Sequence, residues 1–103
     1  MRYRTTRRFV RDFSGLPPEH RRMFVEAIRT QLVPAIATGS FSGSPAWPRK
    51  LRIHRLADSA IHSLTCNFAS PDGRATFHLD RGDGDEPVLV WRRIGDHGIY
   101  DRA

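Results

Sequence analysis

Apolar and polar residues alternate most clearly in two segments of the second half of the chain, residues 61–68 and 73–80. The apolar members of this alternation are Leu64, Cys66, Phe68, Ala75, Phe77 and Leu79. A period of two is typical of a β-strand with one face toward a core. The sequence Pro71-Asp72-Gly73 between the segments is strong turn chemistry, so the pattern predicts an antiparallel hairpin.

A helical period precedes this hairpin. Pro17 and Pro18, followed by an acidic residue, are typical of a helix start. The apolar residues that follow have the i, i+3, i+4, i+8, i+11 spacing of an amphipathic helix: Phe24, Ala27, Ile28, Leu32 and Ala35. Pro34 is expected to kink or end this helix, and Gly39 is the last stop that the sequence allows.

The two ends of the chain also carry element signals. Residues 2–6 alternate and predict a first strand, after which Thr5 or Thr6 can cap a short helix. Phe9 and Phe13 would lie one turn apart on the same face of that helix.

Two further segments complete the predicted order. Residues 49–56 alternate loosely and could be extended, with basic groups on the outer side, and residues 88–91 read as a buried final strand. The order is β-α-α-β-β-β over a single domain, residues 1–103. The predicted class is α+β, with two N-terminal helices packed on one face of a small, largely antiparallel twisted sheet.

Helices on one face would leave the other face of the sheet open. Strand alternation gives that face a polar set of side chains: Ser63, Thr65, Asn67, Arg74, Thr76 and His78. A solvated antiparallel sheet would have the same pattern, so these residues alone do not assign a site.

The charge of the chain adds information on partners. The net charge is +6, and 16 of the 17 basic residues are arginine. Arginine binds phosphate bidentately and stacks on bases, so the composition suits RNA or DNA. There is no long apolar run and no signal-peptide pattern, so we expect a soluble cytoplasmic protein. The single cysteine, Cys66, is expected to be a small core residue.

The C-terminal segment carries the candidate chemistry. Two arginines end the apolar run, Gly95 breaks the strand, and His97 and Tyr100 follow. Alternation puts Arg92 and Arg93 on opposite faces, so at most one can join a site, and Arg93 could instead pair within the chain. An imidazole beside a guanidinium at a strand exit suits acid–base chemistry.

Two motifs together resemble the RelE/ParE superfamily of bacterial type II toxins. One is SPDGRATFHLD (70–80), with an arginine after the turn, and the other is VLVWRRIGDHGIY (88–100), with a final strand, an Ile-Gly turn, a histidine and an aromatic residue. The resemblance covers nearly the whole chain. It implies a metal-independent endoribonuclease, an mRNA interferase that inhibits translation and cleaves mRNA in a ribosome-dependent way. It also implies a cognate antitoxin protein that covers the basic face, and no cofactor.

The resemblance assigns roles to individual positions. The catalytic positions are His97 as acid–base group, Arg74 at the scissile phosphate, Tyr100 against the substrate, and His54 as an auxiliary group. The RNA-binding positions are Lys50, Arg52, Arg55, Arg93 and His78, and no residue is assigned to a metal.

Other interpretations stay open at this point. His97 could only close a turn, Tyr100 could only pack the tail on the core, and Arg74 could pair with Asp72 or Asp80 on the surface. The chain could also be a ParE-like toxin that binds DNA gyrase without nuclease activity, or an inactive interaction module of the same fold.

Overall fold

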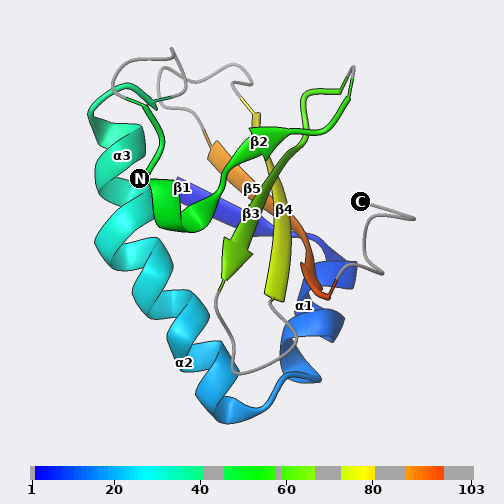
Figure 1. Cartoon of the computed structure of the whole chain (residues 1–103). Helices are drawn as coiled ribbons and strands as arrows, with labels where there is room; N and C mark the ends of the chain where they lie inside the picture. The colour runs from blue at the N-terminus through cyan, green and yellow to red at the C-terminus, as the bar shows by residue number, and fades with distance from the viewer. Residues whose placement is uncertain (1, 41–45, 58, 67–72, 81–87, 97–103) are drawn as a thin grey trace.

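The β-strands of the chain form one mixed sheet (Figure 1). The computed structural model describes residues 2–40, 46–57, 59–66, 73–80 and 88–96. Within these residues the sheet has five strands in the order β1-β5-β4-β3-β2. Their bounds are β1 (Arg2–Thr5), β2 (His54–Arg55), β3 (His62–Cys66), β4 (Gly73–Asp80) and β5 (Val88–Gly95). Only β1 and β5 run parallel, so the predicted α+β class with a largely antiparallel sheet is confirmed.

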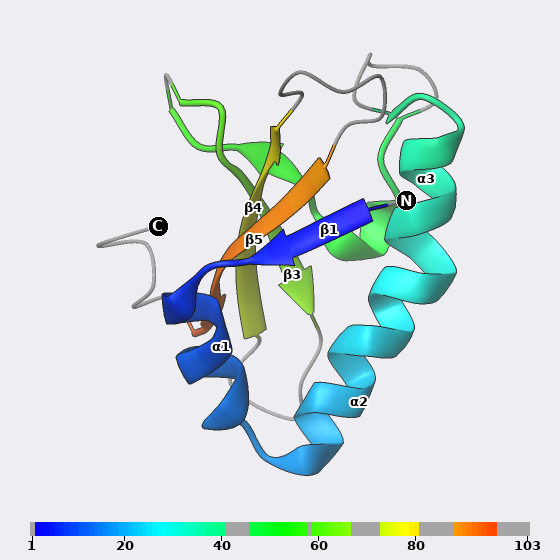
Figure 2. The same cartoon turned by 180° about the vertical axis from the view of Figure 1, so that it is seen from behind.

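The helices lie in the first 40 residues. They are α1 (Arg7–Ser14), α2 (Pro18–Ala27), the π-helical turn η1 (Ile28–Leu32) and α3 (Val33–Ala37). Seen from behind, α1 and α2 stand on the two sides of β1 (Figure 2). The predicted apolar positions of the long helix, from Phe24 to Ala35, are all buried or half-buried.

Pro34 does not end the helix, so of the two outcomes expected at this position, a kink or an end, the end is wrong; the helix stops at Ala37, before Gly39. The backbone passes through the π-turn η1, in which the N–H of Val33 donates to the carbonyl of Ile28, five residues earlier. Pro34 then lies in the first turn of α3. A proline ring collides with the carbonyl four residues before it in an α-helix, and the wider π-turn relieves this collision.

Thr6 is the N-cap of α1. Its backbone is extended, and its Oγ1 accepts a hydrogen bond from the N–H of Phe9 at 3.1 Å. The same Oγ1 donates to the carbonyl of Arg92 in β5 at 2.7 Å. The cap therefore fixes the start of α1 and also ties it to the last strand.

Aromatic side chains form the centre of the core. The ring centroid of Trp91 lies 5.0 Å from that of Phe24, 5.3 Å from that of Phe77 and 5.9 Å from that of Phe9. These rings come from β5, α2, β4 and α1, so one cluster joins both helices to the sheet. Cys66 is buried here too, as predicted, and burial raises the pKa of its thiol to about 12.

The basic segment 49–56 is not one extended strand. It begins with a 3-10 turn, η3 (Arg49–Leu51), and continues into the short strand β2. Arg52 between them has φ 46° and ψ 44°, in the left-handed region. Leu51 is buried in the core, and anchoring it takes the chain out of strand geometry.

The predicted hairpin pairs β3 with β4 in antiparallel register, Leu64 opposite Ala75. Its predicted turn, with Asn67 and Phe68, lies outside the described residues, as do residues 81–87.

The central ring gives the first prediction. Phe77 is fully buried, and its ring lies against those of Trp91 and His62. Replacing it with alanine leaves a cavity between these two rings and should lower the free energy of unfolding by about 3–5 kcal/mol. Met23→Ala on the exposed side of α2 is the control and should change it by less than about 0.5 kcal/mol. Urea denaturation measures both variants, and equal effects would contradict the assignment of Phe77 to the core.

Candidate functional site

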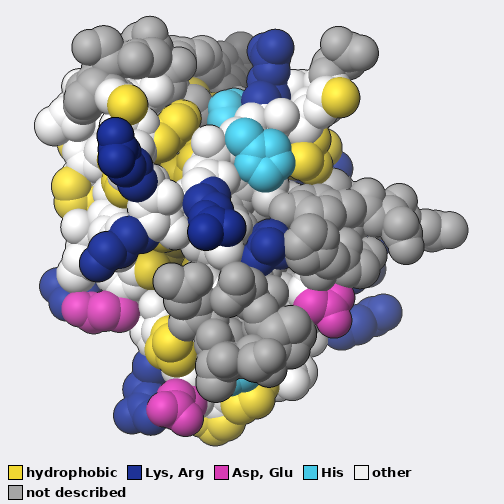
Figure 3. All heavy atoms as spheres, viewed as in Figure 1, with side chains coloured by type: hydrophobic (Ala, Val, Ile, Leu, Met, Phe, Trp, Pro, Cys, Tyr) yellow, Lys and Arg dark blue, Asp and Glu magenta, His cyan; other side chains and the backbone are white. Residues whose placement is uncertain are grey.

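Histidine and arginine side chains meet on the sheet face that α1 and α2 do not cover. We call His54, Arg74, His78 and Arg92 the basic face. They come from β2, β4 and β5. In the space-filling view, Lys, Arg and His side chains gather around β2 and β3 (Figure 3).

The strand register explains why these residues share a face. His54 lies opposite Ser63, and Ser63 lies opposite Thr76. Residues directly opposite in an antiparallel pair point to the same side. Arg74 and His78 lie two residues before and after Thr76 and therefore share its side.

The spacing of the basic face suits an extended polymer. Two inter-strand steps and two residues along a strand put the Cα atoms of His54 and Arg74 about 12 Å apart, and those of His54 and His78 a similar distance apart. Arginine and histidine side chains can span most of such a gap. A phosphodiester group held between them could contact more than one of these side chains.

The last member of the basic face, Arg92, lies at an irregularity in β5. A β-bulge interrupts the pairing of β4 with β5, because Thr76 pairs with Arg93 while Phe77 pairs with Trp91. Arg92 is the extra residue, so strict alternation fails at this point. Its Nη1 lies 3.2 Å from Nδ1 of His78.

This contact fixes the tautomer of His78. Since a guanidinium can only donate, Nδ1 of His78 accepts and its Nε2 carries the proton. Burial lowers the pKa of His78, and the positive charge of Arg92 lowers it further. His78 is thus a neutral donor on this face at neutral pH.

In its neutral form, His54 takes the opposite tautomer. Its Nδ1 lies 3.1 Å from the carbonyl oxygen of Arg52, which can only accept, so Nδ1 carries the proton. The lone pair of Nε2 is then directed away from this bond. An exposed imidazole in this state has the chemistry of a general base.

The centre of this sheet face is closed, which differs from the open face that the sequence indicates. Ser63, Thr65 and Thr76 are buried. Their side chains are short and lie among longer ones such as Arg74 and His78. Asn67, the remaining residue of the predicted polar set, lies outside the described residues.

Arg74 is the second residue of β4, lies on the basic face and is half-buried. Its Nη1 donates to the carbonyl of Gly73 at 3.1 Å. An ion pair with Asp80 is out of reach, because six residues of strand separate the two Cα atoms by about 20 Å. Asp80 instead binds the guanidinium of Arg4 on β1.

Arg93 pairs with Thr76 in the strand register, but its guanidinium is bound by α1, and Arg55 lies on the other side of the sheet. The Nε of Arg93 binds Oδ2 of Asp12 in α1 at 2.6 Å, and both side chains are largely buried. Arg55 pairs with His62, which puts it on the opposite side of the sheet from His54. These two predicted RNA-binding residues therefore do not join the basic face.

Of the other predicted positions, Lys50 and Arg52 are exposed in and just after the turn η3, next to β2. His97 and Tyr100 lie outside the described residues. Arg92 is a member that the sequence analysis missed, since of the two adjacent arginines it assigned Arg93 to RNA binding. Gly95, two residues after Arg93, is a sequence signal for such an irregularity, because a glycine within a strand often marks a bulge.

Within the described part of the chain, no three His, Cys, Asp or Glu residues are grouped so that they could hold a metal ion. In the same part, no helix has the length and apolar character needed to cross a membrane.

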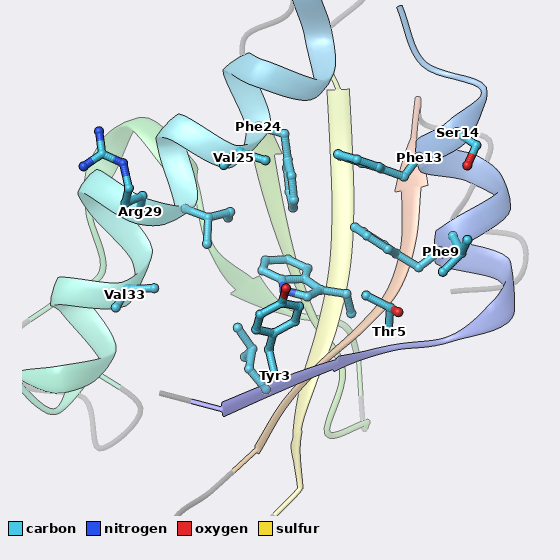
Figure 4. Close-up of a pocket in the computed structure, with 13 residues that line it drawn as sticks. Tyr3, Thr5, Phe9, Phe13, Ser14, Phe24, Val25, Arg29 and Val33 are labelled. Carbon is cyan, nitrogen blue, oxygen red and sulfur yellow. The ribbon is translucent and has the colours of Figure 1, made fainter. Parts of the chain in front are cut away.

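An apolar cleft of about 560 Å³ lies between α1 and α2, on the helical side of the sheet (Figure 4). Phe9 and Phe13 line it from α1, Phe24 and Val25 from α2, and Tyr3 from β1. Three of the side chains that border it are unusually exposed for their type: Tyr3 at 70% and Val10 and Val25 at 52%. Exposed apolar groups around a cleft mark a surface for a ligand or a partner.

Comparisons with protein families, with curated proteins and with solved structures gave no match for this chain. The family resemblance of its two sequence motifs therefore stays a prediction.

The contact between Arg92 and His78 gives the second prediction. Arg92→Gln should raise the pKa of His78 toward its ordinary value of 6.5, because the neighbouring positive charge is lost while the burial remains. Histidine titration by NMR measures this pKa. Arg29→Gln, which removes an exposed guanidinium from the other side of the molecule, is the control and should leave it unchanged.

The sign of the effect on stability follows from the same shift. A histidine pKa that is lowered in the folded state means that the unfolded chain binds the proton more tightly. His78 therefore contributes stability above pH 6.5 that is lost as the pH falls below this value, and Arg92→Gln should weaken this dependence. An unchanged His78 pKa in Arg92→Gln would contradict the contact.

Proposed function

We propose that this chain is the toxin of a bacterial type II toxin–antitoxin system of the RelE-like kind, a metal-independent endoribonuclease that cleaves mRNA in the cytoplasm and inhibits translation. The observation that carries the proposal is the basic face, where a histidine that can offer its Nε2 lone pair shares one side of the sheet with two arginines and a second histidine with a donor Nε2. The two sequence motifs and the α+β fold also support it.

The proposed reaction uses the RNA's own hydroxyl. The ribose 2′-oxygen attacks the adjacent phosphorus, a P–O2′ bond forms and the P–O5′ bond breaks. The products are a 2′,3′-cyclic phosphate and a 5′-hydroxyl end. A base must remove the 2′-proton and an acid must protonate the departing O5′.

The residues can be matched to these needs. His54 suits the base, since its Nε2 lone pair is available. We assign the acid to His97 by the resemblance, with Tyr100 against the substrate. Arg74 suits the stabilisation of charge on the phosphorus oxygens, because fixed donors aimed at developing charge are often the largest catalytic contribution.

Binding of mRNA on the ribosome also needs affinity for phosphates along the strand. Lys50 and Arg52 border the basic face near β2, and Arg92 and His78 extend it toward β5. The net charge of +6 favours association with RNA at low salt, and each phosphate contact adds to the salt dependence.

The third prediction tests this chemistry. Arg74→Ala should lower the rate of mRNA cleavage about 10²–10³-fold, the usual loss for one transition-state donor. His54→Ala and His97→Ala should each lower it about 10²–10⁴-fold, the range of general acid–base catalysis. The measurement is induced expression followed by mapping of mRNA 5′ ends, with growth arrest as a second readout.

Arg29→Ala is the matched control, because this arginine is exposed in the π-turn η1 and bound to Glu26. It should cleave like the original chain. Growth arrest that survives Arg74→Ala and His97→Ala together would contradict the nuclease. Inhibition of DNA supercoiling by the purified protein would then favour the gyrase-binding alternative, and inactivity in both assays would favour an interaction module.

The partner that we propose is a cognate antitoxin that docks in the apolar cleft. Val25 and Phe13, which line the cleft, also border a shallower hollow lined by Arg21 and Arg22. Apolar side chains flanked by arginines complement an amphipathic segment with acidic groups beside its apolar face. The basic charge of the whole chain favours an acidic partner as well.

The fourth prediction concerns this cleft. Val25→Asp puts a charge on an exposed position of the cleft wall, so it should weaken antitoxin binding at least about tenfold, the cost of one unpaired charge in an interface. Cleavage of mRNA should be unchanged. Met23→Asp, on the same helix but outside the cleft lining, is the control. Calorimetric titration with the purified antitoxin measures both, and equal binding by the two variants would exclude the cleft.

A further inference from the structure

β5 is longer than its neighbour β1, so the last residues of β5 have no partner strand on that edge within the described part of the chain. β1 covers β5 only from Val88 to Trp91. The residues Arg92 to Gly95 therefore have β4 on one edge and no strand on the other within the described part of the chain. This uncovered edge includes the bulge that carries Arg92.

Along this edge, the hydrogen bonds that a neighbouring strand would make are made by Thr6, the N-cap of α1, and by Asp12 within α1. The N–H of Thr6 donates to the carbonyl of Trp91 at 3.0 Å, and Oγ1 of Thr6 donates to the carbonyl of Arg92 at 2.7 Å. Further along, Oδ2 of Asp12 accepts from the N–H of Ile94 at 3.2 Å.

Asp12 strengthens this substitution through Arg93. Its two carboxylate oxygens accept from Nε of Arg93 at 2.6 Å and from Nη2 at 3.2 Å. A bidentate pair of this kind fixes direction as well as distance, and here it is mostly shielded from water. The residues on both sides of Arg92 are thus held from α1.

We infer that Thr6 and Asp12 are positioning residues, which from α1 hold the bulge in β5 so that the guanidinium of Arg92 stays beside His78 on the basic face. For Arg92 as a contact to an RNA phosphate, this inference rests on the proposed function. The positioning itself depends only on the described contacts. Neither residue touches the proposed substrate.

The chemistry explains why such support is needed. A bulge removes a ladder hydrogen bond and allows the backbone more freedom than regular pairing. A catalytic or binding group that shifts by about 1 Å can lose about 10²-fold in rate. Because the side chain of arginine is long, a small rotation of its backbone moves the guanidinium far. The hydrogen bond from Thr6 to the carbonyl of Arg92 limits this rotation.

The pKa of His78 reports on this arrangement independently of any activity. The charged groups that act on it are Arg92, Asp80 and Arg4. If Asp12→Asn releases the bulge, Arg92 moves away on average, and the pKa of His78 should rise toward the value found for Arg92→Gln. Glu26→Gln is the matched control. Like Asp12→Asn it removes a carboxylate that binds an arginine, but this ion pair joins Glu26 of α2 to Arg29 of η1 and is exposed.

A pair of substitutions at Thr6 separates positioning from helix capping. Thr6→Ser keeps both the acceptor for the N–H of Phe9 and the donor for the carbonyl of Arg92. Thr6→Asp keeps the cap acceptor but has no donor. We expect the pKa of His78 to stay at its original value in Thr6→Ser and to rise in Thr6→Asp.

Cleavage kinetics give the second readout. Asp12→Asn and Thr6→Asp should lower kcat at least about tenfold, while Glu26→Gln and Thr6→Ser should not. Circular dichroism at the assay temperature establishes that each variant is folded.

An unchanged His78 pKa in folded Asp12→Asn and Thr6→Asp, with a raised value in Arg92→Gln, would overturn the positioning roles. A raised pKa with no RNA cleavage by the original chain would instead support the positioning and reject the proposed function.

Discussion

The fold depends on the parallel pairing of β1 with β5, the first and last strands of the described chain. Parallel neighbours cannot be joined by a tight turn, so the connection between them must pass over the rest of the domain. Here that connection contains both helices and the other three strands. Because α1 follows β1 directly, the pairing also sets α1 against the second half of β5. The aromatic cluster around Trp91 and the contacts of Thr6 and Asp12 both follow from this one constraint.

Local periodicity was enough to predict most of the secondary structure. The hairpin strands, the short helix after Thr6 and the long helix through Leu32 each carry their own period and their own end signals. The misses are elements without a local signal. β2 has only two residues and exists through its pairing with β3, and the helix continues past Pro34 because a π-turn accommodates the ring. A β-bulge also depends on the partner strand, so the pairing of Arg93 with Thr76 could not be read from alternation.

In the candidate site, too, the residue types could be predicted from the sequence, whereas their contacts could not. The sequence could list titratable and basic residues, but not which atoms they would contact. Arg93 binds Asp12, 81 residues away, and so does not join the basic face. The roles of His54 and His78 depend on single contacts with the carbonyl of Arg52 and the guanidinium of Arg92. The contact of His54 depends on the left-handed backbone of Arg52, and that of His78 on the register in which β4 and β5 pair.

The helix α1 links the two surfaces that carry the proposals. Phe9, Val10 and Phe13 line the apolar cleft, while Thr6 and Asp12 bond to β5. One side of this short helix is thus bonded to the sheet, while the other forms a wall of the cleft. An antitoxin segment in the cleft would therefore rest on the same helix that holds Arg92 beside His78. Neutralisation could then act through the position of α1, without a need for the antitoxin to cover the basic face itself.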